Sequence, residues 1–267
     1  MIVKAASLDC DSVILDLEDG VPQEQKEQAR HLIRRLSSDL DWGSRELCVR
    51  INQVGSSNGR RDVALLKGAE RIDSVVVPKA EGGLESVHKR TGKSVIPLIE
   101  TVRGLINIEK ILASDGVVAV SYGAADFALS VGGSVSEYLE NHYVKSKIVV
   151  VARASGVEAI DNVFFELNDM DGFRKQAIRA RALGYSGKQV IHPSQIPIAN
   201  EIFAPSREEV EWAKRVVKAY DEARASGKGA IRVDDRLIDL VHYRAAKQVL
   251  ESGSRPGRAQ SRHTSTC

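Results

Sequence analysis

Residues 95–104 read VIPLIETVRG, an apolar run of strand length that ends in a single carboxylate, Glu100, beside the start of a helical pattern. The same arrangement returns at residues 117–127, VVAVSYGAADF, where Asp126 follows a second apolar run and a glycine. Neither run alternates apolar with polar residues, so we expect both faces of each strand to be covered. Strands of this kind, each followed by a helix, are typical of a parallel sheet built from βαβ units.

Further runs of the same kind occur on both sides of this pair. Together they make seven predicted strands: SVILDLE (12–18), LCVRIN (47–52), SVVVPK (74–79), VIPLIE (95–100), VVAVSYG (117–123), VEAIDNV (157–163) and KQVIH (188–192). Helical patterns lie between them, at 24–36, 60–68, 104–114 and 171–184. Strands that alternate with helices of this length predict an α/β fold with a parallel sheet.

The number of strands bears on the choice between the two common parallel architectures. A closed (β/α)8 barrel needs eight strands, and the opening residues MIVKAASLD read as a helix that leads straight into the first predicted strand. An open doubly wound sheet is the alternative, but no glycine-rich phosphate fingerprint follows the first strand. We therefore predict an α/β fold, a TIM (β/α)8 barrel whose first strand is missing from this chain.

The chain changes character after residue 200. Two amphipathic helices are predicted at 205–227 and 240–251, around a hairpin-like turn at 228–239. The last residues are poor in apolar side chains and rich in Ser, Gly and Arg, a composition typical of disorder. We predict a barrel catalytic domain at 1–204, a C-terminal helical extension at 205–252 and a disordered tail at 253–267.

Composition excludes several classes of protein. The 267 residues carry 38 basic and 36 acidic side chains, and the basic residues are scattered, so we expect no nucleic-acid partner. Cys10, Cys48 and Cys267 are widely spaced and form no CxxC pair, which predicts reduced thiols rather than a disulfide framework or a zinc site. No apolar run reaches the roughly 18 residues of a membrane span, and no signal peptide precedes the first strand. We therefore expect no membrane partner and a cytoplasmic location.

Polar or charged side chains follow every predicted strand. They are Asp16, Glu18, Asp19, Arg50, Lys79, Glu100, Asp126, Asp161 and His192. Catalytic residues of parallel barrels lie at these strand ends, where the following loops form one pocket. Two carboxylates on neighbouring strands, with other positions left to water and substrate oxygens, are the usual Mg²⁺ arrangement, so Glu100 and Asp126 predict a magnesium site. The alternative is that each carboxylate caps the helix that follows it.

Arg50 is the second candidate, because it lies within an apolar strand and a buried arginine needs an anion. That anion is either a ligand or one of Asp16, Glu18 and Asp19, and both interactions can hold at once. Gly123, before Asp126, lets the backbone approach a ligand closely, or else it is a turn residue. Lys188 and His192 read as structural residues rather than as a Schiff-base lysine or a ligand.

An ordered set of motifs carries a resemblance to a known family. They are DSVILDLEDGVP (11–22) followed by Lys26, Ala29 and Arg30, then VRIN (49–52), VPKAEG (77–82), PLIETVRGL (97–105), YGAADFALSVGG (122–133) and GYSGKQVIHPSQI (184–196). In this order they resemble citrate lyase β-subunit-like proteins, the citryl-CoA and malyl-CoA lyase group of the HpcH/HpaI aldolase superfamily. The resemblance covers residues from about 4 to about 250. The opening strand of that family, similar to SLLFVP, has no counterpart here, in agreement with the count of seven.

The resemblance implies a TIM barrel assembled as a homotrimer or hexamer, with Mg²⁺ as cofactor and a CoA thioester and a 2-oxo acid as substrates. By position, Glu100 and Asp126 match the metal-binding carboxylates, and Arg50 matches the arginine that contacts the substrate carbonyl or carboxylate. Asp239, in DDRLID (234–239), matches an aspartate that reaches the site of a neighbouring subunit, where it is the candidate for proton transfer. Arg50, Glu100, Gly123 and Ala124 are then expected to contact the substrate, and Lys79 is left as a rim residue.

The implied reaction is the reversible cleavage of a 3-hydroxyacyl-CoA such as citryl-CoA or malyl-CoA. Cleavage gives acetyl-CoA and a 2-oxo acid, and the reverse reaction joins them. One alternative is a CoA-thioester hydrolase, or a malate or citramalate synthase coupled to hydrolysis, that uses the same metal and Asp239 with water. Another is a lyase subunit that needs an acyl-carrier partner. Candidate substrates differ by a methyl or carboxymethyl group, a difference worth about 1–3 kcal/mol in pocket fit that one sequence does not reveal.

Overall fold

The computed structural model describes residues 2–253. The chain divides into two compact units, one made of the residues up to Ala199 and one that begins at Asn200. The division falls within helix α11 (Ile196–Phe203). Among the described residues, no helix combines the length and the apolar character that crossing a membrane requires.

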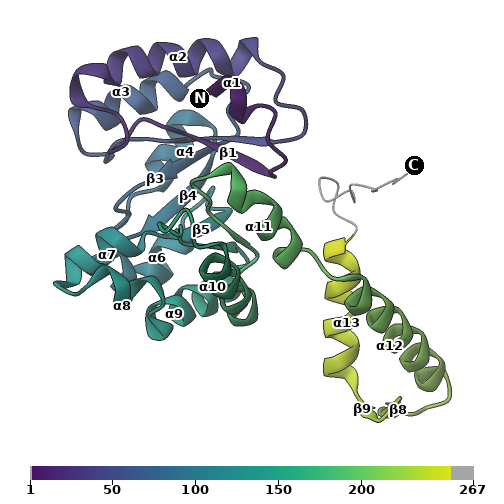
Figure 1. Ribbon diagram of the computed structural model, residues 1–267. Helices are drawn as coiled ribbons and strands as arrows, with labels where there is room; N and C mark the ends of the chain where they lie inside the picture. The colour runs from purple at the N-terminus through teal and green to yellow at the C-terminus, as the bar shows by residue number, and fades with distance from the viewer. Residues whose placement is uncertain (1, 254–267) are drawn as a thin grey trace. The chain divides into compact units, whose positions relative to one another are not determined.

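The first unit contains a curled, parallel sheet of seven strands in sequential order (Figure 1). The strands are β1 (Ser12–Asp16), β2 (Glu46–Arg50), β3 (Ser74–Val77), β4 (Ser94–Ile99), β5 (Ala119–Tyr122), β6 (Glu158–Asp161) and β7 (Gly187–Lys188). Each pair of neighbours is parallel, so all the carboxyl ends lie along one edge, and the register places Asp16 opposite Arg50. The predicted α/β fold and the seven predicted strands are confirmed.

Helices connect the strands and cover the sheet (Figure 1). They are α1 (Ile2–Ala5), α2 (Lys26–Asp39), α3 (Ser57–Leu66), α4 (Glu85–Thr91), α5 (Val102–Ile106), α6 (Ile108–Leu112), α7 (Ala124–Val131), α8 (Val135–Leu139), α9 (His142–Ala154) and α10 (Met170–Leu183), with short 3-10 turns η1 (Gln23–Gln25) and η2 (Pro193–Gln195). Helix α2 buries Lys26, Arg30, Ile33 and Ser37, whose spacing of three or four residues places them on one face.

Burial of the strands follows from the apolar runs. Strands β3 and β5 are buried at every position, and each Val or Leu fully buried in this way contributes about 1.5–3 kcal/mol to stability. Strand β1 differs, because its burial alternates and Ile14 is 40% exposed. Among the described residues β1 has a neighbouring strand on one side only, which leaves part of its surface uncovered.

Two predicted elements are shorter than their sequence patterns. The helix predicted at 104–114 is interrupted at Asn107, where φ is −89° and ψ is 5°, and the Asn107 side-chain amide donates to the Glu81 carbonyl at 3.1 Å. The strand predicted at 188–192 ends at Lys188. His192 instead caps η2, which begins at Pro193, a residue that has no N–H for a strand ladder.

The second unit contains two helices that pack side by side, α12 (Arg207–Ala225) and α13 (Leu240–Gly253). Between them lies an antiparallel hairpin of β8 (Ile231–Val233) and β9 (Arg236–Ile238), where Asp234 has the positive φ of 50° that short hairpin loops require. A capping box of Ser206 and Glu209 begins α12. The buried core consists of Ala213, Val216, Tyr220, Ile238, Tyr243 and Ala246. Residues 254–267 of the predicted tail lie outside the described residues.

Candidate active site

Glu100 lies directly after β4, with only 3% of its surface exposed. It does not cap the following helix, because Thr101 is the N-cap of α5 and its hydroxyl accepts the Gly104 N–H at 2.9 Å. Glu100 Oε1 instead accepts the backbone N–H of Lys79 at 2.6 Å. On the other side lies Gly123, where an added Cβ would be 2.3 Å from Glu100 Oε2, so the close approach requires glycine. The carboxylate is thus held between the ends of β3 and β5.

Asp126 is not at a strand end but in the first turn of α7, whose N-cap is Gly123. Its side chain is 42% exposed, and its Oδ1 lies 3.7 Å from Lys79 Nζ. Burial, together with the negative charges of Asp126 and Glu18, raises the pKa of Glu100 to about 7, although the hydrogen bond from the Lys79 N–H works to lower this pKa. Lys79 contacts both carboxylates, Glu100 through its backbone N–H and Asp126 through its ammonium, so the structure brings the two predicted metal ligands to the same residue.

Arg50, at the end of β2, is held by two carboxylates of the β1 end. Its Nε and Nη2 donate to the two oxygens of Asp16 at 2.7 and 2.6 Å, and Nη1 lies 3.2 Å from Glu18 Oε2. The ion-pair interpretation of Arg50 is therefore confirmed. A guanidinium has five N–H donors, so donors also remain for a ligand.

Lys79, which we expected to be an exposed rim residue, belongs to the same group. Its Nζ donates to Glu18 Oε1 at 2.9 Å and to Asp19 Oδ2 at 3.3 Å. Burial works to lower the pKa of Lys79, but Glu18, Asp126 and Asp19 together raise it. The sequence offers one faint signal for this role, a lysine after the proline that ends a fully buried strand.

The charges at this edge of the sheet favour a divalent cation. Glu18, Asp19, Glu100 and Asp126 surround a single lysine, so negative charge is in excess, and the raised pKa of Glu100 marks a carboxylate that a nearby cation would ionise. Within residues 2–253, no three His, Cys, Asp or Glu side chains enclose a metal position on their own. A cation held here would have Glu100 and Asp126 as protein ligands and would take its other ligands from water and substrate, as Mg²⁺ commonly does.

Asp239 lies in the second unit, before the first residue of α13. Its Oδ1 accepts the backbone N–H groups of Val241 at 3.0 Å and His242 at 3.3 Å, and lies 2.7 Å from His242 Nδ1. The hydrogen bond with the His242 side chain is the largest of the effects that lower the pKa of Asp239. The exposed apolar side chains of Leu237, Leu240 and Val241 surround this carboxylate in the sequence.

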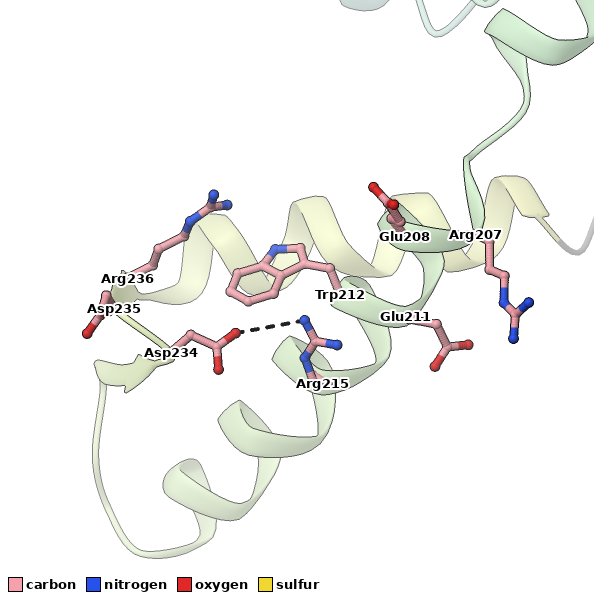
Figure 2. Close-up of a pocket in the computed structure, with 8 residues that line it drawn as sticks. All are labelled: Arg207, Glu208, Glu211, Trp212, Arg215, Asp234, Asp235 and Arg236. Atoms are coloured by element: carbon pink, nitrogen blue, oxygen red, sulfur yellow. Dashed lines mark ion pairs between the residues drawn. The ribbon is translucent and has the colours of Figure 1, made fainter.

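The second unit also has a charged surface pocket, shown in Figure 2. The Trp212 ring lies at its centre, 5.4 Å from the Arg215 guanidinium carbon and 5.2 Å from that of Arg236. An ion pair of 3.8 Å joins Arg215 to Asp234. None of the residues predicted to act on substrate or metal lines this pocket.

Two other residues at strand ends have structural contacts. Asp161, at the end of β6, is buried between Lys145 at 2.9 Å and Lys188 at 2.7 Å. Lys188 Nζ also donates to Asn162 O and Gln176 Oε1, both at 2.5 Å, and burial lowers its pKa. A buried amine with three acceptors is not free to form a Schiff base, in line with the structural interpretation of Lys188.

The family model described as HpcH/HpaI aldolase/citrate lyase matches residues 1–193. The chain belongs to this family. The mitochondrial citramalyl-CoA lyase of Rattus norvegicus is 36% identical over 93% of this chain and 81% of its own length. The L-malyl-CoA/beta-methylmalyl-CoA lyase of Rhodobacter capsulatus is 34% identical over 92% of this chain and 88% of its own length.

Solved structures of HpcH/HpaI relatives agree with the fold. The protein CitE of Mycobacterium tuberculosis, in complex with magnesium, acetoacetate and coenzyme A, superposes with a TM-score of 0.77 at 32% identity, over 94% of this chain and 92% of that one. The resemblance inferred from the ordered motifs is thus confirmed.

Proposed function

We propose that the protein is a magnesium-dependent carbon–carbon lyase that cleaves or forms a 3-hydroxyacyl-CoA thioester, with acetyl-CoA and a 2-oxo acid as the products of cleavage. Its relatives are named lyases of citramalyl-CoA and malyl-CoA, and the M. tuberculosis structure contains magnesium and coenzyme A. The observation that carries the proposal is the buried Glu100 carboxylate, fixed by Lys79 and Gly123 beside Asp126 in a cluster with excess negative charge.

Glu100 and Asp126 would hold the Mg²⁺. When bound, the ion supplies a Lewis acid that stabilises negative charge on the oxygen of the oxo acid. The Lys79 N–H and the close approach of Gly123 restrict the Glu100 carboxylate to one position. Glu100 is therefore preorganised as a metal ligand.

Arg50 would bind the carboxylate or carbonyl of the substrate. Because Asp16 and Glu18 fix its guanidinium on one side, its remaining N–H groups point in a defined direction without further ordering. One preorganised hydrogen-bond donor directed at developing negative charge is typically worth about 3–4 kcal/mol of transition-state stabilisation. Ala124 would add its backbone N–H at the start of α7, a favourable place for a substrate carboxylate, whereas the Gly123 N–H already donates to the Ile99 carbonyl at 3.1 Å, so Gly123 would contact the substrate only by the close approach of its backbone.

Asp239 would transfer the proton. In the cleavage direction the bond between the thioester α-carbon and the hydroxyl-bearing carbon breaks, and its electron pair passes to the thioester as an enolate. The hydroxyl gives its proton to water and becomes the carbonyl of the oxo acid. Asp239, after it has taken up a proton from water, passes that proton to the α-carbon, which becomes the methyl group of acetyl-CoA, so one proton leaves the substrate and one returns. We propose that this Asp239 comes from a neighbouring subunit of a homotrimer or hexamer.

The proposal extends to the closure of the barrel, the role of the C-terminal extension and the location of the protein. We propose that the curled sheet is seven strands of a closed (β/α)8 barrel formed by residues 1–204, with residues 205–252 as an extension that serves a neighbouring subunit. We also propose a reducing location such as the cytoplasm, because the described cysteines Cys10 and Cys48 are free thiols.

Product analysis tests the reaction class. Purified protein with Mg²⁺ is incubated with a panel of 3-hydroxyacyl-CoA esters that includes citramalyl-CoA, malyl-CoA and citryl-CoA. A lyase releases equal amounts of acetyl-CoA and 2-oxo acid. Free CoA together with the intact hydroxy acid would instead show a hydrolase. Turnover only of substrates attached to an acyl-carrier protein would show a lyase subunit.

A further inference from the structure

Lys79 has an unusual backbone conformation for a lysine. Among the described residues, Lys79 and Asp234 are the two non-glycine residues with positive φ, and that of Lys79 is 48°. Asp234 lies in a hairpin loop, where this conformation is expected, but Lys79 follows a buried strand and connects no hairpin. In this left-handed conformation the backbone N–H of Lys79 donates a hydrogen bond to Glu100 Oε1 at 2.6 Å.

The side chain of Lys79 lies among carboxylates from two other parts of the sheet edge. Its ammonium is 2.9 Å from Glu18 Oε1 and 3.3 Å from Asp19 Oδ2, both after β1, and 3.7 Å from Asp126 Oδ1 on α7. One residue therefore contacts both predicted metal ligands, through its backbone to Glu100 and through its ammonium to Asp126.

The neighbouring cation does not duplicate this role. The Arg50 guanidinium is directed toward Asp16 and toward the second oxygen of Glu18, at 3.2 Å. Glu18 thus lies between Arg50 and Lys79, and Lys79 carries the positive charge paired with Asp126.

We propose that Lys79 is the internal counter-ion of the metal site, a positioning residue that sets the affinity for Mg²⁺. This inference rests on the proposed function, because it assumes that Glu100 and Asp126 hold the ion. Without metal, the ammonium offsets the repulsion among Glu18, Asp19 and Asp126 and keeps the acidic edge together. With metal bound, the ammonium and the divalent cation both contact Asp126. Because both are positively charged, the ammonium weakens the binding of Mg²⁺.

Calorimetric titration of Mg²⁺ into the metal-free, full-length protein tests this role. Lys79→Met keeps the backbone N–H and removes the charge, so we expect Mg²⁺ to bind about tenfold more tightly, the size of effect expected for one like charge at a distance of a few ångströms. Lys79→Arg keeps the charge and should stay within about twofold of the wild type. Lys89→Met is the matched control, since Lys89 is an exposed lysine of α4 paired with Glu85, and it should change nothing.

A second readout is the melting temperature. Metal-free Lys79→Met should melt at a lower temperature than the wild type, and saturating Mg²⁺ should raise its melting temperature by more, because tighter binding gives greater stabilisation. If Lys79→Met does not fold, Lys79→Gln removes the same charge with a polar side chain. Equal or weaker Mg²⁺ binding by the neutral variant would overturn the inference.

Glu100→Gln separates this inference from the proposed function. If the wild type binds Mg²⁺ no better than Glu100→Gln, the metal site itself is wrong, and the inference fails with it. If wild-type binding depends on Glu100 but is unchanged in the neutral Lys79 variant, only the role of Lys79 is wrong.

Discussion

The surroundings of Glu100 disfavour the ionised form of its carboxyl group. Burial and the neighbouring Asp126 and Glu18 raise its pKa to about 7, so in the metal-free protein about half of the molecules carry a proton there at neutral pH. A metal ligand has to be ionised, and the proton therefore competes with the cation.

This competition predicts that Mg²⁺ affinity depends on pH. Below pH 7 the protonated form of Glu100 dominates, so affinity should fall about tenfold between pH 8 and pH 6, and binding near pH 7 should release about half a proton per site. Because the folded-state pKa lies above the ordinary value of 4.5, this group stabilises the metal-free fold at low pH, and its contribution is lost as the pH rises through 7. Titrations in buffers of different ionisation enthalpy measure both affinity and proton release; equal affinity at pH 6 and pH 8 would contradict the assignment.

Gly123 is expected to be irreplaceable for a geometric reason. In Gly123→Ala the new methyl would overlap Glu100 Oε2, so the carboxylate has to move. Displacements of about 1 Å at a catalytic group cost roughly 100-fold in rate, and we expect a loss of that size in kcat/KM together with weaker Mg²⁺ binding. Gly55→Ala is the control, since no atom lies within 4 Å of its added Cβ. Gly123→Ala with wild-type activity would show that Glu100 is free to shift.

These site residues were not equally predictable from the sequence. The position of Glu100 at a strand end was predictable, because an apolar run of strand length before a helical pattern places the next residue at the carboxyl edge of a parallel sheet, but the pattern left metal binding and helix capping both open. The pairing of Arg50 with Asp16 or Glu18 was one of two open interpretations. Lys79 was missed, because its contacts depend on a left-handed turn that its residue type does not favour.

At the scale of elements, helix α2 supports the loop that follows β1. The buried Lys26 ammonium donates to the carbonyls of Leu17 at 2.9 Å and Glu18 at 3.0 Å. These bonds hold the backbone of Glu18, whose side chain in turn contacts Arg50 and Lys79. A helix on the outside of the sheet therefore fixes the position of a charge at its edge.

Removal of this support should lower stability. In Lys26→Met the carbonyls of Leu17 and Glu18 each lose a charged donor and keep one neutral donor, the Asn52 side-chain amide and the Val21 backbone N–H. Because hydrogen bonds to charged groups contribute more than neutral ones, we expect the free energy of unfolding to fall by about 1–3 kcal/mol, measured by denaturant titration. The exposed Lys89→Met should leave it unchanged. A Lys26→Met protein as stable as the wild type would mean that water replaces the ammonium without cost.

The elements themselves were largely predictable, and the exceptions have local causes. The seven strands follow from apolar runs, but the last is only Gly187–Lys188, because His192 and Pro193 begin a 3-10 turn. The predicted helix at 104–114 is divided at Asn107, whose backbone leaves the helical conformation with φ −89° and ψ 5°. Asp126 lies on α7 rather than at a strand end, since Gly123 already begins the helix.

At the scale of the whole molecule, the predicted site residues belong to two units. Arg50, Glu100 and Asp126 are in the first unit, and Asp239 is in the second. The proposed role of Asp239 in catalysis can be filled from the same chain or from a neighbouring copy.

Subunit mixing addresses this question. Chains with Asp239→Ala and chains with Glu100→Gln should each be nearly inactive alone. If Asp239 serves a neighbouring subunit, mixed assemblies contain some sites with both residues intact, and we expect part of the wild-type activity to return after the two variants are co-expressed. Sizing of the mixture checks that assemblies form. Mixed assemblies with no gain in activity would place Asp239 in the site of its own chain or outside catalysis.

The most direct test of the metal-dependent mechanism is the rate of 2-oxo acid release from a 3-hydroxyacyl-CoA substrate, measured in a chelator and after Mg²⁺ is added back. We expect the chelator to abolish release, Mg²⁺ to restore it in the wild type, and Glu100→Gln and Asp126→Asn to stay at least about 100-fold slower at saturating Mg²⁺. Full turnover in the chelator, or wild-type rates in both variants, would contradict a cation held by these two carboxylates.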